Sequence, residues 1–122
     1  MSAISLMLDE EKVAAGDRLS GKLSCAIKTP PKEAKVELRW YTEGRGTPDS
    51  QVVDTYLLDP QQLTIGVPLA FSVATPAEGP ITYNGSLLRI LWEVRVSISF
   101  AGVLAKKETT ARLVNVVCRQ SR

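Results

Sequence analysis

Residues 86–100 are the stretch that most limits how this chain can fold. Apolar side chains occupy every second position there, and polar side chains fill most of the positions between them. Such an alternation is typical of a β-strand with one face in a core and the other in water. We expect one face to carry Leu88, Ile90, Trp92, Val94, Val96, Ile98 and Phe100, and the other Leu87, Arg89, Leu91, Glu93, Arg95, Ser97 and Ser99.

Shorter alternating runs recur along the chain between Gly, Pro and Asp residues. They predict strands over residues 3–9, 18–28, 34–42, 51–58, 65–75 and 106–119. Pro68 interrupts one run, which predicts an edge position or a bulge because proline cannot donate to a ladder. Residues 13–17 predict a turn in which Gly16 takes a positive φ. With no run of helical period, the chain predicts an all-β, antiparallel two-sheet sandwich of about seven to eight strands.

The length of 122 residues predicts a single domain over 1–122, with its core over about 3–117 and a short basic tail at 118–122. No apolar run is long enough to span a membrane, and the start of the chain lacks a basic segment ahead of its apolar residues. We therefore expect a cytoplasmic protein. Cys25 and Cys118 then pack as small apolar residues, with a disulfide between them as the alternative.

The residue types argue against common catalytic and metal chemistry. The chain has no histidine, which removes the commonest general base and metal ligand. The acidic run at 9–11 lacks the ligand spacing of a calcium loop, and the glycines around Arg45 lack the Lys-Ser/Thr end of a phosphate loop. We expect no enzyme activity, no cofactor and no metal site. Trp40 and Trp92 are expected in the core.

The charge balance argues against nucleic acid as a partner. The formal net charge is +2, and the basic residues are not interleaved with exposed aromatic residues. The basic pair at 106–107, together with Arg119 and Arg122, leaves peripheral contact with acidic lipids open.

Four local patterns together resemble the arrestin-like domain family. The opening strand with its Gly16-Asp17 turn, the strands at 23–28 and 36–44, and above all the run from Pro80 to Val96 are similar to the family's first strands and its long later strand. In that last motif the matching positions are Pro80, Tyr83, Gly85 and Trp92, with Gly16 in the first. The resemblance covers about residues 3–117 and implies an immunoglobulin-like β-sandwich.

The same resemblance implies a non-catalytic adaptor or scaffold that binds a protein through sheet edges or loops. The family usually has two sandwiches in tandem, and this chain has room for one. The acidic run stands where phosphate-sensing arrestins have basic residues, so no phosphate-binding residue is transferred. The outward residues Arg89, Glu93 and Arg95 are the candidate partner-facing surface.

Two alternatives to the adaptor function stay open at the level of sequence. One is a self-associating subunit, a homodimer that mimics a two-domain arrestin and buries Leu87 and Leu91 of the long strand. The other is a small-ligand binder or an enzyme that uses Lys, Tyr or Glu.

Overall fold

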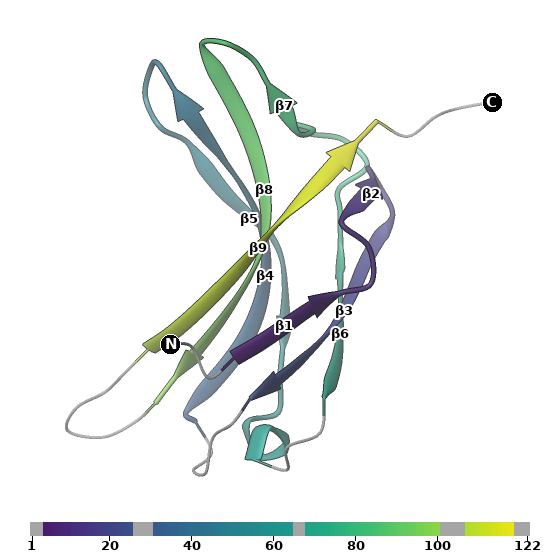
Figure 1. Ribbon diagram of the computed structural model, residues 1–122, viewed down its shortest axis with the longest axis vertical. Coiled ribbons are helices and arrows are strands. Elements are labelled where there is room, and N and C mark those ends of the chain that lie inside the picture. Colours follow the sequence, from purple (N-terminus) through teal and green to yellow (C-terminus); the bar gives the residue numbers. More distant parts are fainter. Residues whose placement is uncertain (1–3, 26–30, 65–67, 101–106, 119–122) are drawn as a thin grey trace.

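The fold is seen in a computed structural model, in which residues 4–25, 31–64, 68–100 and 107–118 are described. Strands dominate these residues (Figure 1). In chain order the elements are β1 (Ile4–Leu8), β2 (Lys12–Ala14), β3 (Arg18–Cys25), β4 (Glu33–Gly44), β5 (Ser50–Leu57), the short 3-10 helix η1 (Pro60–Thr64), β6 (Leu69–Ala74), β7 (Tyr83–Asn84), β8 (Leu88–Ser99) and β9 (Lys107–Val117). The all-β prediction is confirmed, although the alternation pattern did not predict η1, β2 or β7.

Two sheets pack face to face in this molecule. The smaller sheet has the order β1-β3-β6, and the larger has the order β2-β9-β8-β4-β5, with β7 paired to one end of β8. Neighbouring strands are antiparallel apart from β2, which runs parallel to β9. The predicted turn at 13–17 is therefore partly wrong, because Lys12–Ala14 forms a strand. The turn follows it, and Gly16 has the expected positive φ of 92°.

The core lies between the two sheets, where the long strands β4 and β8 pair along their whole length. The predicted inward face of β8 is confirmed over its central part, since Trp92, Val94, Val96 and Ile98 are all buried. They pack with the inward residues of β3 and β4, among them Leu19, Leu23, Val36 and Leu38. Ser97 was expected outward and is nevertheless buried, because its small side chain lies in the ladder between Lys35 and Lys107–Thr109.

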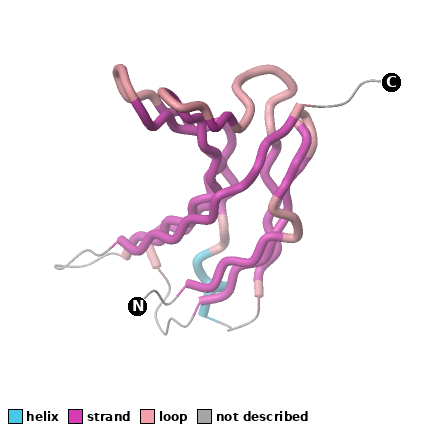
Figure 2. The backbone as a smooth tube through the Cα atoms, turned by 45° about the horizontal axis from the view of Figure 1, so that its top comes forward, coloured by secondary structure: helices cyan, strands magenta, loops and turns pink. Residues whose placement is uncertain are grey.

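One end of the larger sheet extends beyond the smaller one. Figures 1 and 2 show the β4–β5 hairpin and the start of β8 projecting past the end of β3 and β6. Leu88 and Ile90 have the predicted facing but not the burial expected of it: Leu88 is 38% exposed and Ile90 is half-buried. Their side chains lie on the inward face, but no second sheet covers that part of it.

The edges formed by β5 and β6 face each other across the two sheets. β5 has a bulge where its register with β4 shifts between Leu38 and Arg39. From β5, Asp54 Oδ2 accepts a hydrogen bond of 2.6 Å from the backbone N–H of Ala74 in β6. The predicted edge position of the strand after Pro68 is confirmed, although the strand begins at Leu69, after the proline.

Several predictions concern segments outside the described residues. They include the strand ends at 26–28 and 65–67, the residue Lys106, and the basic tail beyond Cys118.

Candidate interaction site

The three residues predicted to face a partner lie on the outer face of the larger sheet, each paired with a side chain of β4. Arg39 Nη1 lies 2.6 Å from Glu93 Oε1, and Arg95 Nη2 lies 3.6 Å from Glu37 Oε1. Arg89 pairs with Glu43 nearer the tip of the hairpin. These pairs stand directly opposite each other in the β4–β8 ladder. The partner role of Arg89, Glu93 and Arg95 stays a prediction, and their charges are already matched within the sheet.

Tyr41 lies between two of these ion pairs on the same face. The guanidinium of Arg39 stands 5.1 Å from the centre of its ring, a cation–π distance. Burial raises the pKa of the Tyr41 hydroxyl, and the nearby carboxylates of Glu93 and Glu43 raise it further. These contacts order the polar outer face, although Arg95 Nε is buried there without a hydrogen-bond partner among the described residues.

The sequence motif at 80–85 fills a fork in the larger sheet. Figure 1 shows β8 and β9 separating, with β8 leaving alongside β4 and β9 continuing towards β2. Thr82 lies in this fork: its N–H donates to Val116 O at 2.8 Å, and its Oγ1 accepts from Val116 N at 2.8 Å. On the other side β7 pairs with the start of β8. The motif thus links two strands that no longer bond to each other.

The structure shows how two residues of this motif are packed. Gly85 does not have a positive φ; a Cβ there would instead lie 2.6 Å from the ring of Tyr83 and 2.9 Å from Leu88 O. The glycine is required by close approach. Tyr83 is 54% exposed and lies over Gly85, so its ring is not buried under a loop. Gly79, which precedes the motif, has a positive φ of 134°.

Replacing Thr82 with valine is expected to lower the free energy of unfolding by about 1–2 kcal/mol, because the N–H of Val116 loses its acceptor. Thr82→Ser keeps the hydroxyl and should cost clearly less. Urea denaturation of the two variants measures the difference. Equal losses in both would show that the hydroxyl does not hold the fork together.

A shallow groove of about 440 Å³ opens beside the fork on the outer face. Its apolar lining comes mainly from Leu91 and from Leu113, which is 58% exposed. Lys12 and Glu11 border it near β2. Leu91 was predicted to face outward, and the structure adds Leu113 as its neighbour.

The first half of β9 forms an open edge of the larger sheet. β2 pairs only with Asn115–Val117, through Asn115 N–H to Glu11 O at 2.8 Å and Ala15 N–H to Val117 O at 2.9 Å. Since alternate residues of a strand direct their backbone groups to the same side, Lys107, Thr109, Ala111 and Leu113 also direct theirs away from β8. No described strand pairs with them there. We call this segment, residues 107–113, the β9 edge.

Sequence reasoning missed the β9 edge, although a signal for it was present. Glu108, Thr110 and Arg112 occupy the positions that alternation with Val114 and Val116 assigns to the inner face. Three polar residues at inward positions indicate that this half of the strand lies outside the core.

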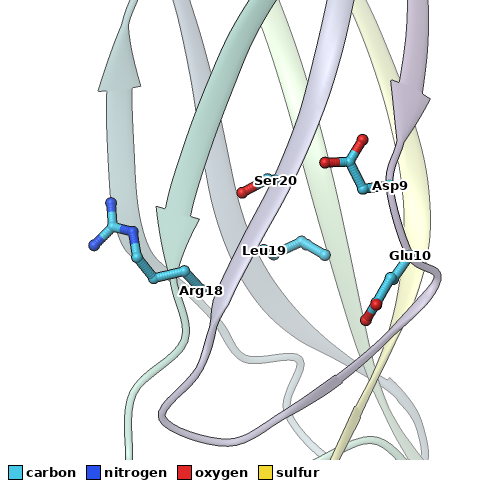
Figure 3. A pocket seen from close by; sticks show the side chains of 5 residues that line it. All are labelled: Asp9, Glu10, Arg18, Leu19 and Ser20. Atoms are coloured by element: carbon cyan, nitrogen blue, oxygen red, sulfur yellow. The ribbon is translucent and has the colours of Figure 1, made fainter.

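Asp9 and Glu10 of the acidic run line one side of a second small hollow, and residues 18–20 of β3 line the other (Figure 3). Asp9 N–H donates to Ser20 O at 3.0 Å, which fixes the point where the chain leaves the smaller sheet. In Figure 3 the guanidinium of Arg18 points away from the Asp9 and Glu10 carboxylates, and its Nε donates to Ser72 Oγ at 2.8 Å. Within the described ranges, no cluster of three or more His, Cys, Asp or Glu side chains could hold a metal ion.

The two cysteines are free and differ in environment. Cys25 is buried as expected, whereas Cys118 is exposed, so the packing predicted for Cys118 is wrong. Burial raises the pKa of the Cys25 thiol, and the charge of Glu108 raises it further. The thiolate is the reactive form, so a raised pKa slows the reaction of Cys25 at neutral pH.

Titration of the folded protein with a disulfide reagent at neutral pH should therefore give one fast thiol and one slow thiol. The fast phase should be lost in Cys118→Ser and retained in Cys25→Ala. Loss of the fast phase in Cys25→Ala instead would contradict the burial of Cys25.

No described helix is both long enough and apolar enough to cross a membrane. No protein-family model matches the chain, and no curated protein matches it in sequence. Among solved structures, the chain is similar to the sporulation control protein Spo0M from Bacillus subtilis, with a TM-score of 0.65 at 10% sequence identity. The similarity covers 95% of this chain and 49% of Spo0M, so the chain spans about half the length of that protein. At this identity the likeness shows the fold alone, which is an arrestin-like β-sandwich.

Proposed function

We propose that this chain is a non-catalytic protein-interaction module, an adaptor or scaffold that binds an extended segment of a protein partner along the β9 edge. The observation that carries the proposal is the row of backbone N–H and C=O groups at Thr109, Ala111 and Leu113, which no described strand uses. An added strand satisfies such groups, and pockets for alternate side chains then provide specificity.

The β9 edge is the least protected of the long edges in the described structure. β5 has a bulge, which discourages pairing with a further strand. The edge of β6 follows Pro68, and the N–H of Ala74 already donates to Asp54. The β9 edge has no proline and no described bulge, and Thr109 and Ala111 are exposed on it. The only charge on its outer face is Lys107 at its start.

The groove beside the fork lies at the end of the same edge and supports the proposal. Leu113 is the last residue of the β9 edge and also lines the groove with Leu91. A partner strand running along β9 would bring one apolar side chain against this pair. Binding is proposed in place of catalysis because the chain lacks histidine and the hollow with the acidic run has no clustered ligands among the described residues. The cytoplasm remains the proposed location.

A displayed library of random linear peptides tests the proposal, because it samples many extended segments at once and requires no identified partner. Peptides selected on the wild-type protein should lose most of their binding to Ala111→Pro. That N–H points to the open side, so proline removes a donor that the β8–β9 ladder does not use. Ala111→Val keeps the N–H and is the matched control. Circular dichroism and thermal melting verify that both variants are folded.

Selected peptides that bind Ala111→Pro as tightly as the wild type would contradict the proposal. In that case the charge reversal Arg89→Glu with Arg95→Glu tests the outer face that the sequence predicted. Loss of binding there would transfer the site to that face.

A further inference from the structure

We propose that the β9 edge pairs antiparallel with the β9 edge of a second copy of this chain, about a two-fold axis at Thr110. The inference rests on the proposed function and names its partner. The two larger sheets then join into one continuous sheet, and neither the outer-face ion pairs nor the face with Leu87 and Leu91 is covered.

The backbone of the β9 edge fits this pairing. Thr109 and Ala111 both direct their N–H and C=O groups to the open side, as do Lys107 and Leu113. With the axis at Thr110, Thr109 of one copy stands opposite Ala111 of the other, and each such pair exchanges two hydrogen bonds. Lys107 and Leu113 pair in the same way. Every open group on this segment gains a partner, and the β8–β9 ladder is unchanged.

The charges of the β9 edge are complementary in this register. Glu108 and Arg112 lie on the same face of β9, one on each side of Thr110. Antiparallel pairing about Thr110 places Glu108 of each copy opposite Arg112 of the other, so the dimer gains two opposite-charge pairs. Arg112 is exposed, and it forms no ion pair among the described residues.

The side chain of Glu108 is an independent indication that a cationic group of the second copy binds beside it. Its Oε2 atom is buried without a hydrogen-bond partner in the described structure. A buried carboxylate oxygen without a donor is costly, and charged groups in such positions are normally paired. The guanidinium of Arg112 from a second copy would approach from the open side and supply the donor.

Two slipped symmetric registers along the β9 edge are less favourable. An axis at Glu108 places two Glu108 side chains opposite each other, and an axis at Arg112 does the same for two arginines. Like charges directly opposite each other destabilise a strand pair. The distribution of charge therefore favours Thr110 as the centre and also disfavours these slipped alternatives.

Disulfide trapping tests the register directly. In a background of Cys25→Ala and Cys118→Ser, Thr110→Cys places two thiols at the axis in a non-hydrogen-bonded pair, where Cα atoms are about 4.5 Å apart. This spacing lies within the range of disulfides. Mild oxidation should trap most of the protein as a covalent dimer. Thr109→Cys is the matched control, because its mate is offset diagonally by about 7–8 Å and should be trapped poorly. Equal trapping of both variants would overturn the register.

A charge exchange tests the pairing under equilibrium conditions. Arg112→Glu and Glu108→Arg, each alone, turn two attractive pairs into two repulsive ones and should weaken dimerisation about tenfold in sedimentation equilibrium. An equal mixture of the two variants should recover the dimer, because the two altered edges have opposite charges. The recovery also shows that both variants are folded.

The outcomes separate this inference from the proposed function. A wild-type protein that stays monomeric at every concentration, with peptide binding still sensitive to Ala111→Pro, overturns the dimer and leaves the interaction module in place. A dimer that ignores the charge exchange and is lost in Leu91→Arg overturns the inference in favour of the face predicted from sequence. If every edge variant keeps both dimerisation and peptide binding, both proposals are overturned.

Discussion

Replacing Trp92 with alanine is expected to lower the free energy of unfolding by about 3–5 kcal/mol, the largest effect of any single change considered for this chain. The Trp92 side chain is fully buried at the point where β8 and β9 separate. It lies opposite Trp40 on one side and Val114 on the other. Its removal leaves a large cavity, because the flanking strands are held by ladders that cannot collapse inward. The midpoint of urea denaturation measures the loss.

Two further variants determine which property of Trp92 matters. Its indole N–H is buried without a hydrogen-bond partner in the described structure. Trp92→Phe removes this unsatisfied donor while it keeps most of the ring volume, so it should cost less than half of the alanine loss. Trp40→Ala removes the cross-strand neighbour, which is only half-buried, and should also cost less. A larger loss at Trp40 than at Trp92 would place the centre of the core elsewhere.

The architecture could be predicted from the sequence because strand period and burial depend on the same residues. Trp92, Val94, Val96 and Ile98 alternate with polar residues, and this alone assigns β8 one face in a core and one in water. The edge position of the strand after Pro68 likewise follows from the missing donor of one residue. Both features depend on residues that are neighbours in the sequence, so the sequence pattern alone can predict them.

The fork could not be predicted in this way, and the β9 edge could be predicted only in part. Both depend on where strands that are distant in sequence stop pairing, and the polar residues at inward positions of β9 indicate only that this half of the strand lies outside the core. Leu88 and Ile90 continue the alternation of β8 although nothing covers them, and Thr82 bonds to β9 although the motif around it predicts only a turn. The short strand β2 leaves the β9 edge open because it runs parallel to β9 and begins only at Lys12, opposite Asn115.

The choice of candidate functional residues is limited in the same way, because alternation is local and the pairing of side chains between strands is not. The candidate residues chosen from alternation, Arg89, Glu93 and Arg95, are matched by β4, a strand far away in sequence. Their charges therefore belong to an internal ladder, and a pair of this kind at the surface contributes little to stability or affinity. Glu108 and Arg112, polar residues that alternation would place in the core, form no ion pair among the described residues, and Glu108 Oε2 is buried there without a hydrogen-bond partner. If the β9 edge binds as proposed, a polar residue at an inward position is a better sign of such an edge here than a charge at an outward one.

Replacing Gly21 with alanine is expected to cost about 3 kcal/mol, the second largest loss. Gly21 lies in β3 opposite Phe71 of β6, and a Cβ at this position would stand 2.7 Å from the end of the Phe71 ring and 2.5 Å from Met7 O in β1. The ring could turn aside, but the carbonyl belongs to the β1 backbone and moves only if the strand moves. Overpacking of this kind destabilises proteins by about 1–3 kcal/mol, and a backbone contact places this site at the upper end.

A double variant separates the two contacts at Gly21. Phe71→Leu shortens the side chain above the glycine, so Gly21→Ala should cost less in that background than in the wild type, yet it should not become neutral while Met7 O stays in place. The size of the remaining cost measures how far β1 resists displacement. A Gly21→Ala variant as stable as the wild type would mean that β1 moves freely at the edge of the smaller sheet. In that case the chain leading from β1 into β2 could also shift, and the β9 edge next to β2 would lose the fixed geometry on which pairing with a second strand depends.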